Sequence, residues 1–78
     1  MLTMYSTPWC GHCNRLKGAL EREGVEFEVI DIEQDPAAAD YVMSVNGGNA
    51  TVPTIVLADG TTLTNPQLPE LLEAVRAA

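Results

Sequence analysis

A chain of 78 residues with 46% hydrophobic content has room for one compact domain, so we expect a single domain over residues 1–78. Four basic and eleven acidic residues give a formal net charge of −7, which argues against a nucleic-acid partner because phosphate binding needs clustered Lys and Arg. No apolar run reaches the roughly 18 residues that a membrane span needs. Residues 1–9 also lack the basic and apolar regions of a secretory signal. We therefore expect no membrane partner and a cytoplasmic location, where thiols stay reduced.

The first predicted elements are a short strand and a helix. Residues 2–6 alternate in polarity and include Thr and Tyr, which is typical of a strand. Thr7-Pro8 ends this strand, and Cys10 stands where the helix begins. The helix carries an apolar stripe at offsets of three and four, formed by Cys13, Leu16 and Leu20. Gly24 then predicts the end of the helix.

Residues 25–32 form the next predicted element. Val25, Phe27 and Val29 alternate with two glutamates, so we expect a half-buried strand. A strand, a helix and a second strand in this order fit a right-handed crossover unit in which the two strands are parallel.

A second helix is predicted to start at Asp35-Pro36, which places a capping side chain and a first-turn proline in the favoured order. Its expected apolar face is formed by Ala39, Val42 and Met43. The helix should end at the turn-forming segment 46–48, which reads Asn-Gly-Gly.

The remaining residues predict a hairpin and a last helix. Residues 54–57 and 61–64 are rich in β-forming side chains, and Asp59-Gly60 between them is a hairpin signal. Asn65-Pro66 opens the final helix, in which Pro69 should make the first turn irregular. The apolar stripe of this helix is formed by Leu68, Leu71, Leu72 and Val75. The order strand–helix–strand–helix–strand–strand–helix predicts an α/β domain with one mixed four-stranded sheet flanked by helices.

The only two cysteines, Cys10 and Cys13, follow a strand at the start of a helix. A bridge between them closes too short a loop to constrain the unfolded chain much, so the pair favours chemistry over stabilisation. Unpaired first-turn amides and the helix dipole favour a thiolate at Cys10, and the thiolate is the nucleophile in disulfide exchange. We therefore predict that Cys10 attacks and that Cys13, one turn later, resolves the mixed disulfide.

The neighbours of Cys10 allow more than one interpretation. His12 is either an imidazolium that stabilises the Cys10 thiolate or an exposed helix residue that points into water. Trp9 is interpreted as a partly exposed rim for a bound substrate. Zinc binding is poorly supported, because a closed site needs four ligands and the chain has no further Cys or His. We expect no metal, although a cluster bridged between two chains through Cys10 stays open.

Val52-Pro53, at the predicted start of a strand, is the second candidate feature. A cis peptide bond here would turn the N–H and C=O of Val52 outward, where they could pair with an extended ligand backbone. The alternative is a proline that simply opens an edge strand.

The strand–Cys-x-x-Cys–helix unit, Thr51-Val52-Pro53 and the final hairpin and helix resemble the glutaredoxins, which have a thioredoxin-like fold, over essentially the whole chain. Segments 9–13, 44–49, 51–54 and 59–66 look more narrowly like the mycoredoxins, the actinobacterial branch. This resemblance implies a thiol–disulfide oxidoreductase that reduces mixed disulfides between proteins and mycothiol. It also implies mycothiol as co-substrate, no tightly bound cofactor, mycothiolated proteins as partners, and a monomer.

The resemblance assigns roles to particular positions. Cys10 would attack the mixed disulfide and carry the mycothiol, and a second mycothiol would release it, so that Cys13 becomes dispensable. Pro53 would be cis, and the Val52 backbone would pair with the bound thiol. Thr51 belongs to the same predicted thiol-binding group. Thr64 and Asn65 would lie beside the same groove.

Two positions depart from the glutaredoxins that use glutathione. Thr7 stands where those proteins usually carry a basic residue, and segment 63–66 replaces their Gly-Gly pair. In those proteins the two features would hold the glutathione carboxylates, so we do not expect specificity for glutathione here. Mycothiol is a sugar-linked thiol with much less negative charge, which fits a groove poor in Lys and Arg. Two alternatives remain: a dithiol electron donor of the ribonucleotide reductase type, reduced by a thioredoxin reductase, and a non-enzymatic iron–sulfur carrier.

Overall fold

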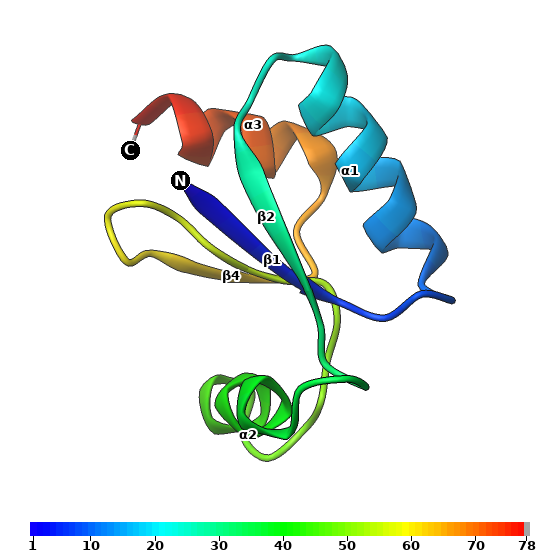
Figure 1. Cartoon of the computed structure of the whole chain (residues 1–78). Helices are drawn as coiled ribbons and strands as arrows, with labels where there is room; N and C mark the ends of the chain where they lie inside the picture. Colours follow the sequence, from blue (N-terminus) through cyan, green and yellow to red (C-terminus); the bar gives the residue numbers. More distant parts are fainter. Residues whose placement is uncertain (78) are drawn as a thin grey trace.

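Seven helices and strands follow one another in the predicted order in the computed structural model, which describes residues 1–77 (Figure 1). Their bounds are β1 Leu2–Ser6, α1 Gly11–Arg22, β2 Phe27–Asp31, α2 Pro36–Val45, β3 Thr54–Val56, β4 Thr62–Thr64 and α3 Leu68–Ala77. The predicted order and the mixed four-stranded sheet are confirmed.

The sheet has the strand order β2-β1-β3-β4. β1 and β2 are parallel, while the pairs β1–β3 and β3–β4 are antiparallel. Tyr5 lies opposite Thr54, and Thr54 lies opposite Thr64. This register places three segments at one end of the sheet: the residues that follow β1, those that precede β3, and those that follow β4.

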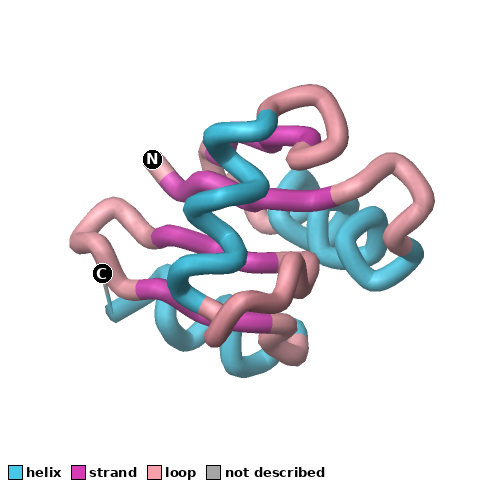
Figure 2. Tube along the Cα trace, turned by 90° about the horizontal axis from the view of Figure 1, so that it is seen from below, coloured by secondary structure: helices cyan, strands magenta, loops and turns pink. Residues whose placement is uncertain are grey.

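The helices cover both faces of the sheet. α1 and α3 lie on one face and α2 on the other, so that α2 crosses in front of the strands when the molecule is seen from below (Figures 1 and 2). The larger core cluster, on the α1–α3 face, consists of Leu2, Met4, Cys13, Leu16, Leu20, Ile55, Leu57 and Leu71. The smaller cluster, under α2, consists of Ile32, Ala38 and Val42. The predicted stripes of α1 and α3 both pack into the larger cluster.

The second strand is shorter than predicted, because Val25 takes part in the turn that closes α1. Gly24 has a positive φ of 70°, and the Val25 N–H donates to the Leu20 carbonyl at 3.0 Å, which closes the helix. Val29 was expected on the buried face of a half-buried strand, but the residue is 38% exposed. β2 is an edge strand, so Val29 has a neighbouring strand on one side only.

α2 begins as predicted, and the Asp35 carboxylate accepts a hydrogen bond from the Ala38 N–H at 3.2 Å. Its buried face differs by one position from the expectation. Ala38 and Val42 are the buried residues, whereas Ala39 and Met43 are only half-buried. The predicted apolar face is therefore rotated slightly about the helix axis from the face that is buried.

The hairpin and the last helix also depart slightly from the predicted bounds. Each strand of the hairpin is one residue shorter than predicted, and a Leu57 N–H to Thr61 carbonyl bond of 2.8 Å closes the turn. The Asp59 carboxylate accepts from the Thr61 N–H at 3.0 Å, which lowers the pKa of Asp59. α3 begins at Leu68 and not at Asn65-Pro66, because Asn65 has a left-handed φ of 48°.

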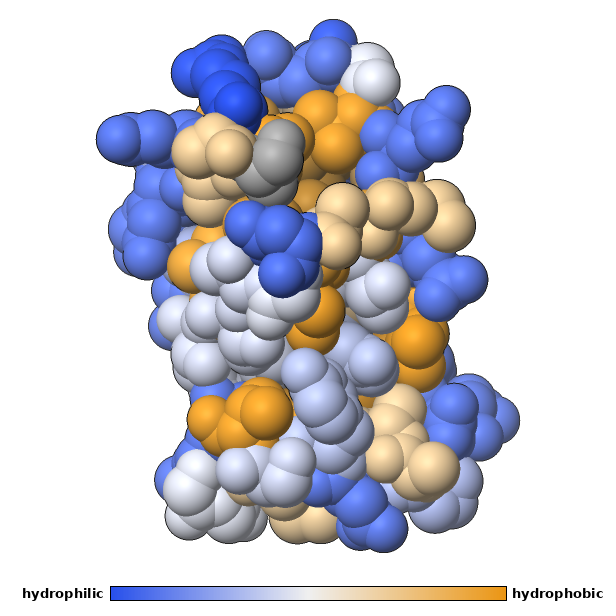
Figure 3. Space-filling view, turned by 90° about the vertical axis from the view of Figure 1, so that its left-hand side faces the viewer, coloured by the Kyte–Doolittle hydropathy of each residue, from blue (hydrophilic) through white to orange (hydrophobic). Residues whose placement is uncertain are grey.

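The molecular surface is mixed in character. On the face seen in Figure 3, hydrophobic patches are separated by hydrophilic and intermediate residues. The large hydrophobic side chains that are exposed are Met1, Trp9, Val29 and Val45. Within residues 1–77, no helix has the length and apolar character needed to cross a membrane.

Candidate active site

Cys10 occupies the N-cap position of α1, as the sequence predicts. Its Sγ accepts a hydrogen bond from the Cys13 N–H at 3.2 Å, and its own N–H donates to the Thr7 carbonyl at 3.3 Å. The positive end of the helix dipole lies at the same point. A thiolate at Cys10 therefore gains both a backbone hydrogen bond and a favourable field, which is the physical basis of an activated thiol.

Cys10 and Cys13 form a disulfide, with their Cα atoms 5.2 Å apart. Cys13 has no exposed surface and belongs to the larger core cluster, whereas Cys10 is partly exposed at its edge. An incoming sulfur atom can reach Cys10 but not Cys13. Cys10 is thus the accessible residue of the pair, and the attacking and resolving roles of the two cysteines stay predictions.

The Val52-Pro53 peptide bond is cis. Pro53 is buried and Val52 is half-buried, and both Val52 and Cys10 pack against the larger core cluster. The Asn65 N–H donates to the Pro53 carbonyl at 2.8 Å, as expected from the Thr54–Thr64 register. Segments 51–53 and 64–65 therefore lie side by side at the end of the sheet that leads to Cys10.

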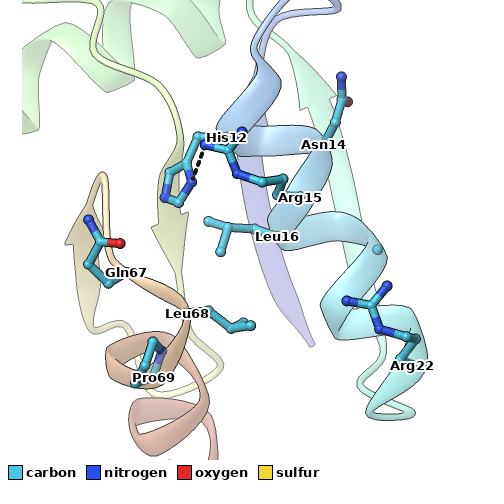
Figure 4. Close-up of a pocket in the computed structure, with 9 residues that line it drawn as sticks. His12, Asn14, Arg15, Leu16, Arg22, Gln67, Leu68 and Pro69 are labelled. Carbon is cyan, nitrogen blue, oxygen red and sulfur yellow. Dashed lines mark hydrogen bonds between the residues drawn. The ribbon is translucent and has the colours of Figure 1, made fainter.

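His12 is placed differently from both predicted interpretations. Its Nε2 bonds the Pro66 carbonyl at 2.8 Å, and its Nδ1 is 3.3 Å from the Arg15 guanidinium (Figure 4). A guanidinium only donates, so Nδ1 accepts and Nε2 carries the proton that is donated to Pro66. His12 is half-buried and joins the start of α1 to the segment before α3, rather than bonding Cys10 or pointing into water.

Trp9 is 71% exposed next to Cys10. Its Nε1 donates to the Glu33 carboxylate at 3.1 Å, which turns the indole toward the loop between β2 and α2. Trp9 thus lies at the surface as expected of a rim residue, and its partner comes from a loop that the sequence analysis did not connect with the site.

Asn46, at the C-cap of α2, is the residue of this region that sequence reasoning missed. Its Nδ2 donates to the Val42 carbonyl at 2.8 Å and to Thr54 Oγ1 at 3.1 Å. Its Oδ1 accepts from Thr64 Oγ1 at 2.6 Å. A single amide therefore joins the end of α2, the start of β3 and the end of β4. In the sequence Asn46 stood before Gly47-Gly48, which indicated a helix end, and within segment 44–49, which carried the family resemblance, but neither signal connected it with the site.

The Asn46 contacts extend to the cis-proline segment. Thr54 Oγ1 donates to the Thr51 carbonyl at 2.8 Å, so a chain of hydrogen bonds runs from Thr64 through Asn46 and Thr54 to Thr51. This chain fixes the 51–53 segment relative to the 64–65 segment. Thr64 itself is exposed, and Thr51 is half-buried.

The segments around Cys10 carry no charge. Residues 7–9, 51–53 and 64–65 contain no acidic or basic side chain, and Thr7 is only 5% exposed. Three of the four basic residues lie on α1 instead, at Arg15, Lys17 and Arg22. Across residues 1–77, no group of three or more Cys, His, Asp or Glu side chains is placed to hold a metal ion.

Comparisons with known proteins agree with this geometry. The glutaredoxin family model matches residues 2–62, and the chain belongs to the glutaredoxin family. It is a glutaredoxin-like thiol–disulfide oxidoreductase with a Cys-x-x-Cys pair. Mycoredoxin 1 of Corynebacterium glutamicum is a homologue, 42% identical over 76 residues that cover 97% of this chain and 94% of that protein.

Two further relatives support the family and the fold. A Mycobacterium tuberculosis protein with a provisional name as a glutaredoxin is 56% identical over 70 residues, covering 90% of this chain and 83% of that protein. The crystal structure of a glutaredoxin from Archaeoglobus fulgidus superimposes with a TM-score of 0.80 at 34% identity. That match covers 96% of this chain and 85% of the other. The predicted thioredoxin-like fold is confirmed.

Proposed function

We propose that this protein reduces mixed disulfides between proteins and mycothiol. The observation that carries the proposal is an accessible N-cap cysteine bordered by segments without any charged side chain. The homology to mycoredoxin 1 over 97% of the chain supports it.

The proposed cycle is a pair of thiol–disulfide exchanges. The Cys10 thiolate attacks the mycothiol sulfur of the mixed disulfide, a Cys10–mycothiol bond forms, and the protein thiolate leaves and takes up a proton. A second mycothiol, as its thiolate, then attacks the sulfur of the bound mycothiol. The products are mycothiol disulfide and the Cys10 thiolate, so one mixed disulfide and one mycothiol yield one protein thiol and one mycothiol disulfide.

The local charge favours mycothiol over glutathione as the reductant. Glutathione brings two carboxylates, which need basic side chains or aimed backbone amides to replace their water. Thr7 is buried and uncharged, so it supplies no such partner. In the proposal, the sugar-linked thiol lies along the Thr51–Pro53 backbone beside Thr64 and Asn65, with Trp9 at the rim and His12 holding the adjacent loop in place.

The test is single-turnover release of mycothiol from a mycothiolated protein by the Cys13→Ser variant. We expect release with mycothiol as reductant at a rate within about tenfold of the native protein, because Cys13 takes no part in either exchange. Cys10→Ser is the matched control and should show no release above the uncatalysed rate. Absence of turnover by Cys13→Ser would exclude the monothiol cycle. Equal rates with glutathione would exclude the proposed preference for mycothiol.

A second candidate is a dithiol electron donor, and the closed Cys10–Cys13 disulfide is the observation that favours it. Cys13 lies close enough to displace a bound substrate thiol and leave the disulfide seen here. Reduction of that disulfide by a thioredoxin reductase without mycothiol, together with an inactive Cys13→Ser variant, would favour this function over the first.

A further inference from the structure

A groove of about 420 Å³ runs between α1 and the first turn of α3, on the side of α1 shown in Figure 4. Leu16 of α1 faces Leu68 and Pro69 of α3 across it. Gly18, in the middle of α1, also lines the groove, although glycine is unfavourable inside a helix compared with alanine. The missing side chain leaves room for the Arg22 guanidinium, whose Nη1 lies 3.4 Å from the position that a Cβ at Gly18 would take.

The groove is positively charged in a protein that is otherwise acidic. Arg15 and Arg22 line it, and none of its nine lining residues is acidic, although the whole chain carries eleven acidic residues. The two arginines are seven positions apart and therefore lie on the same side of α1. Within residues 1–77, Arg22 has no ion-pair or hydrogen-bond partner, whereas Arg76 lies 3.9 Å from Glu23. The positive end of the α3 dipole adds to the same field.

The groove begins close to the redox pair, although neither cysteine lines it. His12, two residues after Cys10, lines its near end and is held there by Arg15 and Pro66. Arg15 and Arg22 follow Cys10 by five and twelve residues, which places them about 7 Å and about 18 Å along the helix axis at 1.5 Å per residue. An extended peptide covers about 3.3 Å per residue, so these distances correspond to about two and about five residues from a substrate cysteine.

We propose that this groove docks an acidic, extended segment of the mycothiolated protein, next to the cysteine that leaves as a thiolate when Cys10 attacks the mycothiol sulfur. Carboxylates about two and about five residues from that cysteine pair with Arg15 and Arg22, and an apolar side chain between them rests on the half-buried Leu68 and the exposed Pro69. The inference rests on the proposed function for the chemistry at Cys10 and adds the selection of the protein partner. The low-molecular-weight thiol and the protein segment then occupy different sides of Cys10.

The first experiment compares synthetic peptides that each carry one cysteine in a mixed disulfide with mycothiol. One has glutamates two and five positions after the cysteine and a leucine between them, a second has the same residues before the cysteine, and controls carry glutamine. We expect one acidic peptide to have a kcat/KM about three- to tenfold above its glutamine control, as two partly exposed pairs supply. The advantage should shrink in 0.5 M salt, because exposed charges are screened. Equal kcat/KM for acidic and glutamine peptides in both orders overturns the proposal.

The second experiment assigns the effect to the groove with two variants of equal net charge. Arg22→Glu should remove most of the advantage of the acidic peptide, whereas Lys17→Glu, on α1 but outside the groove, should retain it. Equal losses in both variants would show a general charge effect and would refute a specific site.

Binding separates this inference from the proposed function. Peptides with serine in place of cysteine are titrated against the native protein and both variants, and the Kd is read from fluorescence anisotropy. Weaker binding of the acidic peptide to Arg22→Glu alone supports docking even if mycothiol is not the reductant. Failure of all peptides to turn over, with binding intact, refutes only the function. Equal binding of acidic and glutamine peptides refutes the docking site.

Discussion

The two faces of the sheet hold the site in different ways. On the α1–α3 face, Cys10 and Cys13 are positioned by the larger core cluster and by the helix that starts between them. On the α2 face the apolar cluster is small, and the cis-proline segment is positioned by the hydrogen bonds of Asn46. Packing fixes the nucleophile, and polar contacts fix the backbone beside it. The two halves of the site should therefore fail in different ways.

The largest loss of stability is expected on the α1–α3 face. Leu20 is fully buried in the larger cluster, so Leu20→Ala should lower the free energy of unfolding by about 2–5 kcal/mol. Val42→Ala, in the smaller cluster, should cost only about 1–3 kcal/mol, because less apolar volume is removed. Urea unfolding of both variants measures the difference. A Val42→Ala loss as large as that of Leu20→Ala would contradict the contrast between the two faces.

The second prediction concerns the hydrogen bonds of Asn46 on the α2 face. Asn46→Ala leaves Thr54 and Thr64 without their partner and should cost about 1–3 kcal/mol of stability. It should also raise the KM for the mixed disulfide more than it lowers kcat, because Cys10 is untouched and only the neighbouring backbone loosens. Steady-state kinetics of the folded variant measure this split.

Two control variants test whether the Asn46 amide itself is responsible. Asn46→Asp keeps the size and the acceptor for Thr64 but loses both donor bonds, so its KM should lie nearer to that of Asn46→Ala than to the native value. Asn49→Ala removes only an exposed bond of 3.3 Å and should leave KM unchanged. A change in kcat alone for Asn46→Ala would argue against a positioning role.

The same contrast explains what the sequence could predict. The stripe formed by Cys13, Leu16 and Leu20 repeats locally, so its burial could be predicted from spacing, and so could the N-cap position of Cys10. The Asn46–Thr64 bond joins residues 18 positions apart, and the His12–Pro66 bond spans 54 positions. Contacts between residues so far apart in the sequence leave no periodic pattern from which they could be predicted. The Val52-Pro53 segment was singled out because a proline stands at a predicted strand start, and the resemblance implied its cis bond, but the residue that holds it in place was not predicted.

The third prediction concerns the α2 cap, which the sequence did identify. Asp35→Ala removes the acceptor of the Ala38 N–H and should cost about 1 kcal/mol. Asp35→Ser restores an acceptor at the same position and should recover most of that loss. Thermal unfolding of the two variants gives the comparison. Equal losses would mean that the Asp35 charge, rather than its capping bond, stabilises α2.

The smallest effect is a pH dependence on the α2 face. Burial raises the pKa of Tyr5 above its ordinary value of 10.0, and the charges of Tyr41, Glu28 and Asp35 raise it further. The Tyr5 ring packs beside Tyr41, with the two ring centroids 5.3 Å apart. Between the ordinary and the raised pKa, the unfolded chain has released the phenol proton that the folded protein keeps. Stability should therefore fall as the pH rises through this window and should not depend on Tyr5 below it.

Tyr5→Phe tests this contribution, because it removes the phenol proton and keeps the ring that packs beside Tyr41. The oxidised form is used, since disulfide-bonded cysteines do not ionise. The difference in urea midpoint between Tyr5→Phe and the native protein should be constant from pH 7 to 9 and should shift in favour of the variant above pH 10. Leu20→Ala, on the opposite face, should follow the native pH dependence throughout, displaced by a constant amount. A native slope retained in Tyr5→Phe would place the alkaline sensitivity outside the α2 face, and the polar side would then be no more sensitive to charge than the packed one.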